Sequence, residues 1–185
     1  TAFIIEECFP GEEFAVDAFY DERGQAVVVN IHKHIFSSSE DVSDRVYISS
    51  RDIILDNLVE FTEFLNRVGE LAGVCNFPVH LELRRQVNGT LLPIEVNPMR
   101  FGGWCSTGDA AYFAYGLNAY TAYIRNIRPD WYRLLDGKDG RVYGLVVLDN
   151  STGMGGGDID GFDYEKLART FTNVLELRKI DHKAY

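Results

Sequence analysis

Two short strand-like segments joined by Asn88-Gly89 constrain this chain more than any other feature. Residues 79–87 alternate apolar and polar side chains as a half-buried strand does, and residues 90–97 follow directly after the Asn-Gly pair. Asn-Gly is the strongest short signal for a two-residue hairpin turn, and such a turn determines how the two strands pair. The sequence therefore predicts an antiparallel hairpin over residues 79–97.

The predicted register brings two acidic residues face to face. With Val87 opposite Thr90, Glu82 pairs with Glu95. The other expected pairs are Leu83 with Ile94, Leu81 with Val96 and His80 with Asn97. One face then carries His80, Glu82, Glu95 and Asn97, and the other carries the apolar members for the core. Like charges directly opposite destabilise a sheet by roughly 0.2–1 kcal/mol unless something neutralises them.

A hard cation would neutralise the two glutamates. Two carboxylates and the amide oxygen of Asn97 form an all-oxygen ligand set that suits Mg²⁺ or Mn²⁺ and leaves other positions for water and substrate phosphates. The same spacing also fits a solvated sheet face on which both glutamates point at water. The residues that follow favour the metal site, because they place an arginine and a glycine pair directly beyond the carboxylates.

The segment Asn97-Pro98-Met99-Arg100-Phe101-Gly102-Gly103 resembles the ATP-grasp superfamily, whose signature ends in Glu-x-Asn-Pro followed by arginine and glycine. The resemblance is to the carboxylate–amine ligase type, with a carbamoyl-phosphate-synthase-like ATP-binding domain. It implies that Glu82, Glu95 and Asn97 hold Mg²⁺ (or Mn²⁺) on the phosphates of ATP. The match departs at one position, because Met99 directly follows Asn-Pro and Arg100 comes next.

The N-terminal segment resembles the hinge of the same family. A buried-strand run at residues 3–5 leads into Glu6-Glu7-Cys8-Phe9 and then Gly11-Glu12-Glu13. The resemblance places Glu6, Glu7, Cys8 and Phe9 at the edge of the adenine, and the carboxylate of Glu13 on the ribose hydroxyls. A carboxylate can accept hydrogen bonds from both hydroxyls, so the chemistry fits the residue.

Lys33, His80 and Arg100 complete the predicted catalytic residues. By resemblance, Lys33 reaches the terminal phosphates or the substrate, His80 contacts phosphate or acylphosphate, and Arg100 binds the substrate or the transferred phosphate. The alternative for residues 32–34 is a surface strand with both histidines on one face and Lys33 on the other. Two histidines at this spacing can bind zinc, but no third ligand is evident nearby.

Composition limits the functional classes. The chain has 185 residues, a formal net charge of −10 and 46% hydrophobic residues, which suffice for one globular domain with a real core. The acidic balance argues against a nucleic-acid partner, because phosphate backbones require a basic face. No apolar run reaches the roughly 20 residues that cross a bilayer. Three widely separated cysteines favour a reducing compartment, so we expect a cytoplasmic protein.

The remaining patterns predict an α+β fold, with an antiparallel sheet and helices packed on one face, as in the C-terminal lobe of ATP-grasp enzymes. We expect one domain over residues 1–185. Helices are predicted from Ser50 to about Gly69–Gly73, over residues 109–126, and from a cap at Asp163; residues 141–148 should form a further strand. The glycine-rich segment 151–161 is expected to be a mobile surface loop, with a lid over the site as the alternative, and the patterns assign no role to Cys105.

The resemblance implies an ATP- and Mg²⁺-dependent ligase that forms an acylphosphate and lets an amine or similar nucleophile displace the phosphate. An ATP-grasp kinase and a nucleotide-binding module without turnover are the alternatives. The expected partners are a small carboxylate, an amine-type substrate and an upstream lobe of the same polypeptide, with a homodimer left open. Because that lobe covers the nucleotide in the family, we expect the isolated chain to be inactive. The sequence names neither the carboxylate nor the nucleophile.

Overall fold

The computed structural model describes residues 3, 5, 7–38, 41, 43, 45–103, 106–148, 150 and 152–184. These residues divide into two compact units, 1–147 and 148–185. The first unit contains the whole sheet and all the residues predicted to act on substrates, so the account of the site concerns this unit alone. The second contains a short 3-10 helix, η2 (Gly156–Asp158), and one short helix, α5 (Tyr164–Ala168).

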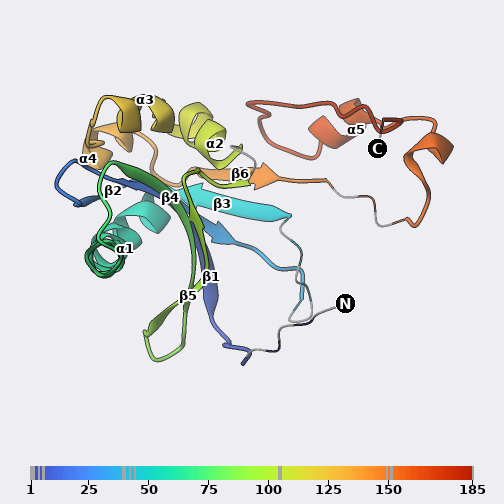
Figure 1. The fold of residues 1–185 in the computed structure, drawn as a ribbon. Helices are drawn as coiled ribbons and strands as arrows, with labels where there is room; N and C mark the ends of the chain where they lie inside the picture. The colour runs from blue at the N-terminus through green and yellow to red at the C-terminus, as the bar shows by residue number, and fades with distance from the viewer. Residues whose placement is uncertain are drawn as a thin grey trace. The chain divides into compact units, whose positions relative to one another are not determined.

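Six antiparallel strands form a single sheet in the order β5-β4-β1-β2-β3-β6 (Figure 1). The strands are β1 (Glu12–Tyr20), β2 (Ala26–His34), β3 (Val46–Ser50), β4 (Phe77–Arg85), β5 (Leu91–Pro98) and β6 (Val142–Val146). The long strands β4, β1 and β2 are neighbours in the sheet; nearly all residues of β1 and β2 are buried, and more than half of those of β4. The predicted α+β architecture with an antiparallel sheet is confirmed.

One face of the sheet packs on the long helix α1 (Arg51–Ala72), which lies beside the sheet in Figure 1. Ser50 caps its N-terminus by accepting from the Ile53 amide, and Gly73 ends it in the left-handed conformation, as the sequence predicted. The Phe14 ring of β1 meets the Phe61 ring of α1 edge-on, with centroids 5.1 Å apart. Apolar residues at the helical spacing therefore bury this face of β1.

The opposite face of the sheet is polar along much of its length and carries the candidate site. Phe19, near the end of β1, points to this face and packs on Tyr123 of α3 (Ala119–Ile124), with ring centroids 5.6 Å apart. Helix α2 (Ser106–Tyr115) also lies here, since Asn30 of β2 donates to the Thr107 carbonyl. Helices thus occupy both faces of the sheet rather than one, and the short α4 (Trp131–Leu134) completes unit 1.

In the β4–β5 hairpin the residues from Glu82 to His80 pair as predicted, but the turn and the pairing next to it differ from the prediction. Its turn is one residue longer than predicted, because Gln86 pairs with Thr90 and Gly89 adopts a φ of 84°. A bulge between Glu82 and Leu83 then restores the register, so that Leu83 lies opposite Pro93 and not Ile94. β5 is also an edge strand, which leaves Ile94 and Val96 47% exposed and not in the core as predicted.

Three other predicted elements are shorter than the patterns indicated. The helix expected over residues 109–126 is divided into α2 and α3, because Gly116 has a φ of 73° and Asn118 caps the second helix. A continuous helix would have placed Phe113, Leu117, Tyr120 and Ile124 on one buried side. In the structure Phe113, Tyr120 and Ile124 are 38–78% exposed, and only Leu117 of these four is buried. The last helix starts at the predicted cap Asp163 but ends at Ala168, and the predicted strand 141–148 spans residues 142–146.

Candidate active site

Glu82 and Glu95 are cross-strand partners, as the sequence predicted, and the next pair on the same face is His80 with Asn97. Glu82 on β4 is partly buried, with 18% of its side chain exposed, and Glu95 on the edge strand β5 is exposed. Asn97 is half-buried. The hairpin therefore brings two carboxylates and a carboxamide to one end of the polar face.

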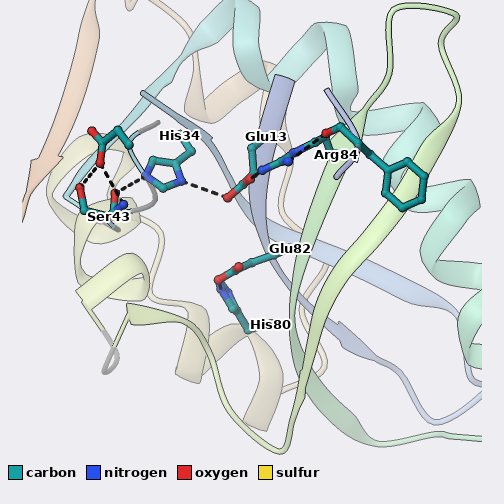
Figure 2. A network of polar contacts seen from close by, with 8 residues as sticks. Glu13, His34, Ser43, His80, Glu82 and Arg84 are labelled. Atoms are coloured by element: carbon teal, nitrogen blue, oxygen red, sulfur yellow. Dashed lines mark hydrogen bonds and ion pairs between the residues drawn. The ribbon is translucent and has the colours of Figure 1, made fainter. Parts of the chain in front are cut away.

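His80 is held between two carboxylates. Its Nδ1 lies 2.8 Å from Asp17 Oδ1, and its Nε2 lies 3.4 Å from Glu82 Oε1; Figure 2 shows the ring beside Glu82. Ionised carboxylates only accept hydrogen bonds, so both ring nitrogens donate and the ring is an imidazolium. Burial would lower the pKa of His80, but the hydrogen bonds to Asp17 and Glu82 outweigh it and raise the pKa to about 9.

Asp17 is a carboxylate in the middle of β1, a strand in which all residues but Glu12 are buried. Only 1% of the residue is exposed, and its Oδ1 also accepts from the Gly102 amide at 2.8 Å. Burial would raise the pKa of Asp17, but the hydrogen bond from His80, the charge of His80 and the contacts from Thr107 and Gly102 hold it below its usual range. Asp17 stays ionised and keeps His80 charged.

Glu13, the predicted ribose ligand, lies between two cations (Figure 2). Its Oε2 forms an ion pair with Arg84, and its Oε1 accepts from His34 Nδ1 at 3.1 Å. The other His34 nitrogen faces the Ser43 carbonyl at 3.0 Å, so this ring also donates from both nitrogens. Burial would raise the pKa of Glu13, but His34 and Arg84 hold it below its usual range.

The predicted adenine residues lie just before β1. Glu6 lies outside the described residues, while Glu7 and Cys8 are exposed and Phe9 is half-buried. The Phe9 carbonyl accepts from Arg84 Nη1 at 2.9 Å. Arg84 therefore links the hinge segment to Glu13.

Arg100 and Lys33 differ in how they relate to this site. Arg100 lies in the loop directly after β5, where its guanidinium donates to the Phe101 carbonyl at 3.3 Å. Lys33 is the cross-strand partner of Phe14 and forms an ion pair with Glu12. Directly opposed partners share a face, so Lys33 lies on the α1 side of the sheet and the structure does not bring it to the carboxylates.

The donor chemistry of the hairpin fits a hard cation. Among the described residues, no group of three or more His, Cys, Asp or Glu side chains is placed to hold a metal ion, so a metal here requires the Asn97 amide as well as both glutamates. The Asn97 side-chain nitrogen is buried without a partner, and its amide can turn to present the oxygen instead. The Glu82 contact with His80 engages one of its two oxygens.

Sequence reasoning missed Asp17, Arg84 and the pairing of His34 with Glu13. Asp17 carried a usable signal, because it is the one charge inside the apolar run Phe14-Ala15-Val16-Asp17-Ala18-Phe19. A charge at a buried strand position needs a partner, which indicates a polar cluster on that face. The role of Arg84 depends on its cross-strand neighbour Glu13, which lies 71 residues away in the chain.

Comparison with known proteins agrees with this geometry. A sequence model of the family described as ATP-grasp domain matches residues 1–108, which is more than half of the chain. The chain belongs to the ATP-grasp family. The matched residues of this ATP-grasp chain include β1, β2, the β4–β5 hairpin and the loop that carries Arg100. The predicted family is thus confirmed.

Solved structures show the same fold. The ATP-grasp chain is similar to an L-amino acid ligase from Bacillus licheniformis, with 24% identity, a TM-score of 0.56, and coverage of 77% of this chain and 36% of that one. It is also similar to a phosphoribosylglycinamide synthetase from Anaerococcus prevotii, with 19% identity, a TM-score of 0.50, and coverage of 63% and 29%. The chain thus spans about a third of the length of these proteins. Comparison with curated protein sequences gives no match.

The helices of the ATP-grasp chain are short or amphipathic. None within the described part of the chain is long and apolar enough to cross a membrane.

Proposed function

We propose that this chain is the nucleotide- and metal-binding lobe of an ATP-dependent carboxylate ligase. The observation that carries the proposal is the pairing of Glu82 with Glu95 across β4 and β5, with Asn97 on the same face. Two facing carboxylates are unfavourable in a sheet unless cations neutralise them, and the His80 imidazolium contacts only one oxygen of Glu82. Family membership and the likeness to two ligase or synthetase folds support the same function.

In the proposed reaction, ATP phosphorylates a small carboxylate to an acylphosphate, and an amine or similar nucleophile then displaces the phosphate. Glu82, Glu95 and Asn97 would hold Mg²⁺. The ion would supply charge neutralisation for the transferred phosphoryl group. Arg100, in the loop after β5, would bind the carboxylate or the transferred phosphate.

His80 orients the Glu82 carboxylate in this scheme. Both of its ring nitrogens face carboxylates, so a hydrogen bond to phosphate would require Nε2 to leave Glu82. That contact is 3.4 Å long, whereas the Asp17 contact is 2.8 Å. The ring is therefore anchored on Asp17, and its second nitrogen is the end that can exchange partners.

Glu13 would accept hydrogen bonds from the ribose hydroxyls, with Glu7, Cys8 and Phe9 beside the adenine. His34 and Arg84 already contact its two oxygens. Each carboxylate oxygen has two acceptor positions, so each can accept a further bond from ribose. The two cations also keep Glu13 ionised and restrict its rotation, which prepares the acceptor before the nucleotide binds.

The test is ATP turnover by the full-length protein with a panel of carboxylates and amines. The proposal predicts ADP and phosphate release that depends on both substrates. Stable phosphorylation of a substrate without phosphate release would indicate a kinase, and no turnover with any pair would indicate a binding module. Exposed, unpaired Cys8 and Cys75 support a reducing compartment such as the cytoplasm, and the assay therefore includes a thiol reductant.

A variant pair tests the metal site within the same assay. Glu95→Gln removes one charged ligand while keeping nearly the same shape, so turnover should fall by orders of magnitude. Glu63→Gln makes the same chemical change at an exposed position of α1 and should leave turnover unchanged. Equal turnover in both variants would refute the assignment.

A further inference from the structure

We propose that Asp17 is a positioning residue, whose carboxylate ties the loop after β5 (residues 99–103, here the Arg100 loop) to His80 of β4 and so sets Arg100 beside the metal ligands. The effect on catalysis rests on the proposed function. The tether itself, by which we mean the hydrogen bonds from Gly102 and His80 to the Asp17 carboxylate, does not, because it is a property of the folded chain.

One carboxylate oxygen makes both halves of the tether. Asp17 Oδ1 accepts from the Gly102 amide and from His80 Nδ1, each at 2.8 Å. Asp17 lies on β1, His80 on the neighbouring strand β4, and Gly102 in the loop that follows the edge strand β5. One oxygen atom therefore connects β1, β4 and this loop. The Arg100 loop thus turns back from the edge strand over β4 to reach β1.

Close packing of the Arg100 loop on His80 accompanies these hydrogen bonds. A Cβ atom placed on Gly102 would lie 2.1 Å from His80 Cε1 and 2.2 Å from its Nδ1. The backbone of the loop therefore lies directly against the imidazole ring, and only glycine fits at this position. This contact fixes the distance between the loop and the ring that also touches Glu82.

The other polar group of Gly102 is held as well. Thr107 Oγ1 donates to the Gly102 carbonyl at 2.9 Å, and the Thr107 carbonyl accepts from Asn30 at 2.7 Å. The amide and the carbonyl of one loop residue are thus bound from β1 and from α2. Gly102 is therefore a fixed point of the Arg100 loop.

Arg100 lies between two fixed neighbours. Before it, the Met99 amide donates to the Pro78 carbonyl at 2.9 Å, with Met99 in the left-handed region at a φ of 64°. After it, Phe101 is 3% exposed and meets the Tyr120 ring edge-on. The backbone on both sides of Arg100 is held, and Asp17 supplies the attachment that also contacts His80, the neighbour of Glu82.

The fold alone gives no reason for a carboxylate at position 17. Only 1% of Asp17 is exposed, and burying a charge costs free energy. The second oxygen, Oδ2, is buried without a hydrogen-bond partner. A residue that lowers stability, in a strand whose other residues suit a buried sheet, is typical of a functional position.

The test compares Asp17→Ala with Asp17→Asn by amide hydrogen exchange, residue by residue, in the chain without nucleotide. Alanine removes the acceptor, so exchange at Gly102 should accelerate at least tenfold, while amides at the far end of the β1–β2 pair, such as Val27, should keep their protection. Asparagine presents an oxygen at the same place and should restore Gly102 protection to within a few-fold of the wild type.

Unchanged protection of Gly102 in Asp17→Ala would overturn the proposal. A uniform loss over the whole sheet would also overturn it, because that result indicates a purely structural role. If Asp17→Ala does not fold, Asp17→Ser takes its place, because serine keeps a polar group that is too short to reach the Gly102 amide; faster exchange at Gly102 with stable strand amides supports the tether, and unchanged exchange refutes it.

Kinetics in the full-length protein separate this proposal from the proposed function. Asp17→Ala should lower kcat about tenfold or more with little change in the KM for ATP, and Asp17→Asn should recover most of the loss. A loss confined to the KM for ATP would refute the positioning of Arg100. If the wild type shows no ligase activity, the proposed function fails, while the exchange result still decides whether the tether exists.

Discussion

His80 and His32 should give the stability of this protein opposite dependences on pH. His80 is an imidazolium between two carboxylates, and its folded-state pKa is raised to about 9. His32 is fully buried without a partner for Nδ1, and burial lowers its pKa to about 4, an effect that the charge of His80 reinforces and that of Asp17 opposes. An unfolded histidine titrates near 6.5. Stability should therefore be greatest near this pH and fall on either side.

The fall in stability above pH 6.5, here the alkaline limb, is due to His80. Its stabilisation is fully present below pH 6.5, where the folded and unfolded states both bind the proton, and is lost as pH rises toward 9, where only the folded state keeps it. The slope between these values is about −1.36 kcal/mol per pH unit, so the loss from pH 6.5 to 9 is about 3 kcal/mol.

The fall in stability below pH 6.5, here the acid limb, is due to His32. Below pH 6.5 His32 binds a proton in the unfolded chain but stays neutral in the folded protein. The free energy of unfolding therefore falls as pH decreases. Between pH 6.5 and 5, before most carboxylates titrate, the loss is about 2 kcal/mol.

Urea unfolding of the wild type, His80→Gln and His32→Gln between pH 5 and 9 measures both limbs. His80→Gln should flatten the alkaline side of the stability profile, and His32→Gln the acid side. Because the charge of His80 also lowers the pKa of His32 and of Asp17, His80→Gln should change the acid side as well. A difference between the wild type and His80→Gln that does not vary with pH would refute the charged Asp17–His80–Glu82 arrangement.

Three further changes test other parts of the account. Phe61→Ala empties a completely buried position between α1 and β1 and should lower the free energy of unfolding by about 3–5 kcal/mol, whereas Val59→Ala at a 68% exposed position of the same helix should have little effect in the same urea titration. Gly102→Ala should cost about 1–3 kcal/mol because its Cβ meets the His80 ring, whereas Gly144→Ala, which meets nothing within 4 Å, should not show this loss. In steady-state kinetics, Glu13→Ala should mainly raise the KM for ATP and Arg100→Ala should lower kcat or raise the KM for the carboxylate; exchanged signatures would refute both assignments.

The hairpin shows how far sequence reasoning extends. The pairing of Glu82 with Glu95 was predicted from a two-residue turn, yet the turn contains an additional residue and a bulge compensates for it. Pro93 lies at that bulge, and a proline in an edge strand is a known mark of irregular pairing, because it donates no ladder hydrogen bond. The predicted pairing of the two glutamates was right, and the two-residue turn from which it was predicted was wrong.

Other features depended on contacts between distant strands. Helix α1 was predictable because its cap, apolar spacing and terminal glycine are all local. The break at Gly116 and Asn118 was also local, and glycine followed by a capping residue signals it. By contrast, the Asp17–His80–Gly102 cluster joins three segments, and only the strand order β5-β4-β1 brings them together.

Manganese binding followed by NMR tests the central claim most directly, because Mn²⁺ is paramagnetic and broadens the signals of nuclei close to it. With Mn²⁺ and ATP added to the protein, the account predicts selective broadening of the amide signals around Glu82, Glu95 and Asn97, and loss of that broadening in Glu95→Gln but not in Glu63→Gln. Broadening elsewhere, or broadening of the same signals that persists in Glu95→Gln, would contradict a metal site on this hairpin.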